Sequence, residues 1–151
     1  MTTAAPPRAA THASAACAAI ASIVIAGCAA SVPPLPEGAP VATWEWNAEG
    51  ADQALLEGEL ALEDGCVYVV SSDGLRTLPV FPVDRVGWDA DAETLTYGGA
   101  EFEMGDAIAA GGGWTAPPES AIIPDGCEPD EWGDVMLVQD ESLAPMTERG
   151  Y

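Results

Sequence analysis

Cys28 is the residue whose type and setting most clearly indicate chemistry. It closes the tetrad Ile25-Ala26-Gly27-Cys28, which ends the apolar run Ala13–Gly27 and precedes the proline-rich stretch Ser31–Pro40. A cysteine thiol is a good nucleophile, so it can accept a covalently attached group. This chemistry makes Cys28 a candidate for covalent modification.

The tetrad resembles the bacterial lipobox. The resemblance implies that Cys28 receives a diacylglyceryl group and that a peptidase cuts just before it. Residues 1–27 carry Arg8 and no Asp or Glu, which is typical of a secretory signal peptide. Cys17 fits less well, because Ser14 stands where an aliphatic residue is needed. The expected location is the extracytoplasmic face of the cell membrane, with the membrane as partner through this anchor.

Two other interpretations of the N-terminal segment stay open: an ordinary secretory signal, cleaved or uncleaved, and a cytosolic protein. A membrane-spanning helix needs about 20 predominantly apolar residues. The strongly apolar side chains here are only Ile20, Ile23, Val24 and Ile25, so we do not expect this segment to form such a helix.

The composition is strongly acidic. The chain has 25 Asp and Glu against 4 basic residues, all of them arginine, and a formal net charge of −21. A field of this sign repels phosphate backbones and anionic headgroups, so nucleic acid is not an expected partner. Attachment to a membrane would depend on the acyl chains rather than on the protein surface.

Cys66 and Cys127 are the two other cysteines downstream of Cys28. Outside the cytoplasm such a pair favours a disulfide, which would contribute about 4 kcal/mol in the chain-entropy description. Two separate buried thiols are the alternative. Zinc is disfavoured because there is no CxxC motif and the one histidine, His12, belongs to the signal segment.

The chain divides into four expected parts. Residues 1–27 form the signal peptide, 28–42 a proline-rich tether, 43–139 a β-domain and 140–151 a flexible tail.

Within the expected domain, hydrophobicity alternates with a period of two. Residues 56–62 alternate leucine or glycine with glutamate or alanine, Asp64-Gly65 suits a type I′ turn, and Cys66–Val70 returns as a strand. Pro79 and Pro82 place their strand at a sheet edge or bulge. The remaining strands are expected at Leu78–Val83, Val86–Trp88, Thr94–Tyr97, Phe102–Met104, Ile108 and Val135–Val138. We therefore predict an all-β fold, a small antiparallel barrel (OB-like) or sandwich of about six or seven short strands.

A second resemblance concerns the order of turn and core residues over roughly Leu56–Val138. The segments that carry it are, in order, Gly65-Cys66, Leu78–Pro82, Met104–Ile108, Gly111–Gly113, and Cys127 before a strand with Trp132 and Val135. This order resembles small uncharacterised envelope β-domains common in high-GC Gram-positive, actinobacterial-type organisms. The resemblance implies a fold and a disulfide, and no activity or cofactor.

Several catalytic classes are excluded by composition. Downstream of Cys28 there is no histidine, and the chain has no lysine; histidine-dependent triads, Schiff bases and P-loop sites therefore cannot form. Gly111–Gly113 has no basic residue after it to hold a phosphate, so we expect a bulge or turn there. No catalytic residue and no cofactor are predicted.

Asp89, Asp91 and Glu93 are the weak metal candidate. Alternating carboxylates suit Ca²⁺, but Thr94 stands where an EF-hand loop needs glycine and Ala100 where it needs glutamate. A solvated turn is the favoured interpretation. We also favour a solvated segment over a metal site for a second acidic cluster: Asp125, Glu128, Asp130, Glu131 and Asp134.

Five tryptophans are the remaining feature. Trp44 and Trp46 share one strand face, while Trp88, Trp114 and Trp132 lie elsewhere. Exposed tryptophans bind glycan rings or partner surfaces, whereas in a small barrel they commonly form core.

Three classes of function follow. The favoured one is a lipid-anchored, acidic, non-catalytic envelope module that binds an unidentified protein, peptide or glycan. The second is a structural or Ca²⁺-binding surface protein. The third is a glycan hydrolase that uses only carboxylates.

Overall fold

The hairpin between strands β2 (Ala54–Glu63) and β3 (Cys66–Val70) shows how the local sequence sets the fold. Asp64 and Gly65 have φ values of 50° and 78°, and the pairing closes with Glu63 opposite Cys66. Both turn residues have the positive φ that a type I′ turn requires, so the predicted hairpin is confirmed. The computed structural model describes residues 1, 32, 35–47 and 53–143. Cys28 and its tetrad lie outside the described residues, as do residues 144–151.

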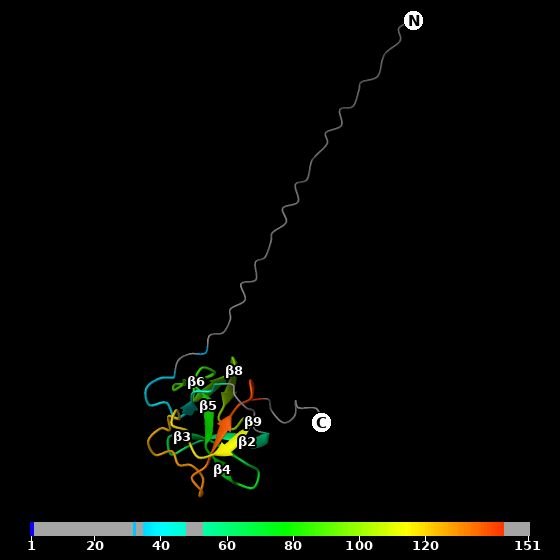
Figure 1. Cartoon of the computed structure of the whole chain (residues 1–151). Helices are drawn as coiled ribbons and strands as arrows, with labels where there is room; N and C mark the ends of the chain where they lie inside the picture. The colour runs from blue at the N-terminus through cyan, green and yellow to red at the C-terminus, as the bar shows by residue number, and fades with distance from the viewer. Residues whose placement is uncertain (2–31, 33–34, 48–52, 144–151) are drawn as a thin grey trace.

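The described residues contain ten strands and no helix (Figure 1). None of these residues belongs to a helix long and apolar enough to span a membrane. Besides β2 and β3, the strands are β1 (Ala42–Trp44), β4 (Arg76–Thr77), β5 (Pro79–Pro82), β6 (Val86–Asp89), β7 (Thr94–Tyr97), β8 (Ala100–Glu103), β9 (Ala107–Thr115) and β10 (Val135–Val138).

The strands form two sheets. A curled seven-stranded sheet has the order β1-β5-β10-β9-β2-β3-β4, and a three-stranded sheet has the order β6-β7-β8. The all-β prediction is confirmed, and the arrangement is consistent with a small barrel or sandwich. The described residues form ten strands rather than the expected six or seven. Two pairs, β1–β5 and β10–β5, are parallel where antiparallel pairing was expected. Parallel neighbours need long crossovers, and here the crossovers contain other strands, so alternation within one strand could not reveal the pairing.

Apolar side chains fill both faces of the seven-stranded sheet. On one face, Val67 and Val69 join a core shared with Trp88 and Leu95 of the smaller sheet. On the other face, Cys66 and Tyr68 pack with Cys127 of the connection 116–134, which is orange in Figure 1. Burial on both faces explains why β3 has a continuous apolar sequence rather than an alternating one.

The prolines of β5 lie inside the sheet rather than at its edge. Pro79 and Pro82 are the first and last residues of the strand, and β5 lies between β1 and β10. Proline lacks an N–H donor, which is tolerated at strand ends. The edge prediction was therefore wrong, because both prolines stand where the ladder begins or stops.

Gly111–Gly113 lies within β9, not in a turn or bulge. A Cβ atom at Gly112 would come within 1.9 Å of the Leu137 carbonyl oxygen in the neighbouring strand. Glycine is required here by the close approach of another backbone, not by turn geometry.

The packed chain extends beyond both expected domain boundaries. Leu35 and Ala39, in the expected tether, pack against the core between the sheets. At the other end, Leu143 is buried in the same core, and the Asp140 carboxylate accepts a hydrogen bond from the Gly111 N–H at 2.6 Å. Short segments beyond both expected ends of the domain thus contribute to its packing.

Candidate binding site

A hollow of about 780 Å³ lies between strand β4 and the connection 116–134. This volume is in the range of small-ligand sites. The residues that line it come from the β3–β4 turn, from β4, from the end of β9 and from the connection: Leu75, Arg76, Thr77, Trp114, Glu128, Pro129, Asp130, Glu131, Trp132 and Asp134.

Three large apolar side chains are exposed around this hollow. Trp132 is 75% exposed, Leu75 58% and Trp114 42%. Single exposed apolar residues are ordinary on protein surfaces, but three around one concave site are a feature that favours an interaction surface.

The exposed side chain of Trp132 is carried by a hydrogen-bonded turn. The Asp130 carboxylate Oδ1 accepts hydrogen bonds from the N–H groups of Trp132, at 2.9 Å, and Asp134, at 2.8 Å. The Gly133 N–H donates to the Asp130 carbonyl oxygen at 3.0 Å. An aspartate that bonds the backbone two residues on is the usual way to fix such a turn, so the exposed indole stands on an ordered backbone.

Leu75 is presented by a second ordered turn. The Leu75 N–H donates to the Ser71 hydroxyl at 3.1 Å, and the Ser71 N–H donates to the Leu75 carbonyl oxygen at 3.0 Å. The Ser71 hydroxyl in turn donates to the Asp73 carboxylate. This hydrogen bond, with further backbone hydrogen bonds, lowers the pKa of the Asp73 carboxyl.

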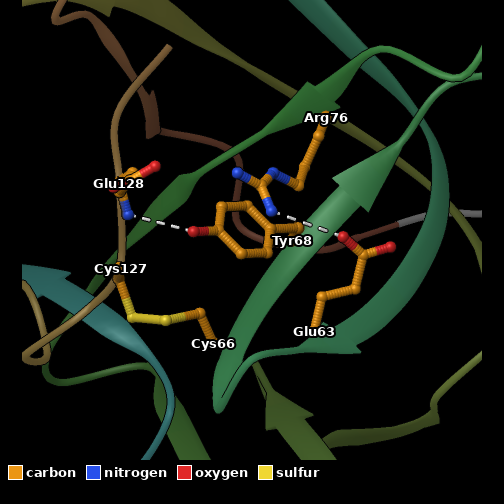
Figure 2. Close-up of a disulfide and its surroundings, with 6 residues drawn as sticks. All are labelled: Glu63, Cys66, Tyr68, Arg76, Cys127 and Glu128. Atoms are coloured by element: carbon orange, nitrogen blue, oxygen red, sulfur yellow. Dashed lines mark hydrogen bonds and ion pairs between the residues drawn. A yellow bond between two sulfur atoms is a disulfide. The ribbon is translucent and has the colours of Figure 1, made fainter.

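Two contacts fix the connection 116–134 to β3 (Figure 2). Cys66 and Cys127 form a disulfide, as predicted. One residue further on, the Glu128 N–H donates to the Tyr68 hydroxyl at 3.0 Å. Because Cys66 and Tyr68 share one face of β3, the disulfide and the hydrogen bond lie side by side, next to Glu128, which lines the hollow.

Arg76 is engaged by groups of its own chain. Its guanidinium lies 3.5 Å from the Glu63 carboxylate and 4.3 Å from the centre of the Tyr68 ring. Figure 2 shows the three side chains beside one another. The ion pair is exposed and contributes little to stability. Its consequence for the site is that the one basic side chain lining the hollow is already paired.

The acidic residues expected as a weak metal candidate lie elsewhere, at the end of β6 and in the β6–β7 turn. Asp89 Oδ1 accepts hydrogen bonds from the N–H groups of Asp91 and Ala92, at 2.9 and 3.0 Å, and Glu93 has φ 51°. The Asp89 carboxylate thus organises the turn. No cluster of three or more potential metal ligands occurs among residues 35–47 and 53–143.

The second acidic cluster is divided between the hollow and the surface beyond it. Glu128, Asp130, Glu131 and Asp134 line the hollow, and Asp125 does not. The sequence had not identified Leu75, Arg76 or Thr77 as site residues. An apolar residue directly after the Asp73-Gly74 turn was the one signal that could have pointed to Leu75.

The tryptophans have different environments. Trp88 is buried in the core between the sheets. Trp44 packs beside the core around the disulfide, and the Trp46 ring lies under the Arg85 guanidinium at 4.6 Å. Only Trp114 and Trp132, among the described tryptophans, line the hollow. Trp88 therefore belongs to the core, whereas Trp114 and Trp132 lie on the surface, where binding by them stays a prediction.

Comparison of the chain with protein-family models, curated proteins and solved structures found no match.

Proposed function

We propose that this protein is a lipid-anchored, acidic, non-catalytic binding module on the extracytoplasmic face of the cell membrane, and that the hollow takes its ligand. The observation that carries the proposal is the exposure of Trp132 and Trp114 around one concave site. Tryptophan is enriched where proteins bind partners, because its large ring gives contact area at small entropic cost.

The ordered walls of the site support the same proposal. Trp132 stands on a turn fixed by Asp130, and the connection that carries it is tied to β3 by the disulfide. A preformed site loses less conformational entropy on binding than a loop that must first become ordered.

The anchor is proposed from the sequence around Cys28. Mass spectrometry of the membrane fraction should find a mature peptide that begins at a diacylated Cys28, and Cys28→Ala should give unprocessed or released protein. Soluble wild-type protein with an intact N-terminus would contradict the anchor without affecting the binding proposal.

Binding at the hollow is tested by photo-crosslinking in living cells. A photoreactive amino acid replaces Trp132 in one variant and Ile122 in the other; Ile122 is 68% exposed and does not line the hollow. We expect a discrete crosslinked product at position 132 and none at position 122. The same products at both positions, or none at either, would refute the hollow as the binding site.

Catalysis is tested separately. Turnover of a glycan or ester by the purified domain, abolished by substitution of one Asp or Glu, would replace the binding proposal with an enzymatic one.

A further inference from the structure

We infer that the ligand of the hollow is a cationic polypeptide segment, with a lysine or arginine side chain seated against Trp132 and Trp114 among the surrounding carboxylates. The inference rests on the proposed function and names the class of its ligand.

The charge around the hollow is the first argument. Four carboxylic residues line it, Glu128, Asp130, Glu131 and Asp134, against one arginine, Arg76. The Arg76 guanidinium lies 3.5 Å from Glu63, outside the lining set. The hollow is therefore negative within a chain of net charge −21. Such a site attracts cations and repels anionic ligands.

The aromatic surface is the second argument. An ammonium or guanidinium group over an indole face is attracted by the ring quadrupole, and tryptophan is the best of the aromatic residues for this. The protein already uses this contact internally. Arg76 lies over the Tyr68 ring at 4.3 Å, and Arg85 lies over the Trp46 ring at 4.6 Å. Trp114 and Trp132 offer the same surface to an external cation.

The residues around the site favour a polypeptide over a bare metal ion as its ligand. No group of three potential metal ligands gathers in the described part of the chain, and a metal ion would leave the apolar lining unused. In addition, β4 is an edge strand of the seven-stranded sheet and supplies Arg76 and Thr77 to the lining. An extended peptide can hydrogen-bond along an edge strand, whereas a glycan has no matching row of peptide groups.

The test measures binding of acetylated, amidated pentalysine to the intact purified protein by calorimetry at low and at physiological salt. Pentaglutamate and cellotetraose are the comparison probes. Two variants change the hollow, Trp132→Ala and Glu131→Gln. Two matched controls lie outside it: Ile122→Ala, at an exposed apolar position, and Glu101→Gln, at an exposed glutamate of β8. All four side chains lie on the surface, and thermal unfolding checks that each variant is folded.

We expect pentalysine to bind and pentaglutamate not to bind. Trp132→Ala should weaken the affinity about fivefold, as expected for loss of an exposed cation–π contact. Glu131→Gln should weaken it about threefold, as for loss of a surface ion pair. Ile122→Ala and Glu101→Gln should leave it unchanged within error. Higher salt should weaken binding to the wild type and to both controls.

Three results would overturn the inference. Equal losses of affinity in Glu131→Gln and Glu101→Gln would mean that pentalysine is attracted only by the overall negative charge of the protein and not by the hollow. Binding of cellotetraose but not pentalysine, lost in Trp132→Ala, would make the ligand a glycan and leave the proposed function standing. Absence of pentalysine binding also refutes the cationic ligand; if residue 132 then gives no specific crosslink either, the proposed function fails with it.

Discussion

The Tyr68 hydroxyl accepts a hydrogen bond from the Glu128 N–H at 3.0 Å, one residue after the cysteine that forms the disulfide with Cys66. Both ties start from the same face of β3, and both end in the connection 116–134. That connection has no strand of its own between β9 and β10. Its Ile122 pairs with Thr43 of β1 through two backbone hydrogen bonds, and the two contacts with β3 hold the part that begins at Cys127 and lines the hollow.

Removal of the disulfide should therefore destabilise the whole domain. We expect the double variant Cys66→Ala/Cys127→Ala to lose about 2–4 kcal/mol of unfolding free energy, because the bridge joins residues 61 apart in sequence and restricts the unfolded chain. Urea denaturation of the wild type and the double variant measures the difference. Equal stabilities would show that the noncovalent contacts of the connection suffice.

Gly112→Ala should be among the most damaging small substitutions. Its Cβ would lie 1.9 Å from the Leu137 carbonyl oxygen, and the two strands would have to separate. We expect a loss of about 3 kcal/mol or more, or no folded protein. Gly99→Ala is the matched control: Gly99 has open space around it but φ 86°, so the expected loss is about 1 kcal/mol from backbone strain. A smaller loss for Gly112→Ala than for Gly99→Ala would contradict the packing argument.

The hairpin at Asp64-Gly65 shows what could be predicted from the sequence, and the requirement for glycine in β9 shows what could not. Asp64-Gly65 and the alternation in β2 are local signals, and they predicted the correct turn and strands. The role of Gly112 depends on Leu137, a residue of another strand, and no local pattern reports such a contact. The parallel pairing of β5 was missed for the same reason, since β1 and β10 are both distant from it in sequence.

The candidate site was predicted in parts only. The sequence singled out the tryptophans as core or possible binding residues and the acidic residues of the connection as a weak metal candidate, whereas it did not identify Leu75 and Arg76. These two sets of residues come together because the disulfide and Tyr68 bring the connection 116–134 to β3, next to β4. Their meeting is a tertiary contact that composition and spacing do not encode locally.

Tyr97 should make stability fall at alkaline pH. Its hydroxyl donates to the Asp140 carbonyl oxygen at 2.6 Å, and burial raises its pKa to about 12. In the unfolded chain a tyrosine titrates near pH 10, so between about pH 10 and 12 the unfolded state binds fewer protons than the folded state. The stabilisation is then complete below pH 10 and lost as pH rises through the folded pKa.

Tyr97→Phe tests this linkage. At pH 8 the variant should be about 1 kcal/mol less stable, because the hydrogen bond to Asp140 is lost. Urea denaturation at several pH values should then show a shallower alkaline decline for the variant than for the wild type. Parallel declines would show that Tyr97 does not carry the alkaline effect.

Asp130 should control how firmly Trp132 is presented. Asp130→Ala removes the oxygen that accepts the N–H groups of Trp132 and Asp134, so we expect amide exchange at both positions to accelerate about tenfold, as for loss of a hydrogen bond to a charged group. Asp130→Asn keeps an acceptor oxygen at the same place and should restore most of the protection. Asp125→Ala, an exposed aspartate of the same connection that does not line the hollow, is the control and should change neither rate. If Trp132 is held by this turn, Asp130→Ala should also weaken pentalysine binding while global stability stays close to that of the wild type. Unchanged exchange at Trp132 would mean that the rest of the connection, tied down at Cys127 and Glu128, orders the turn without its aspartate.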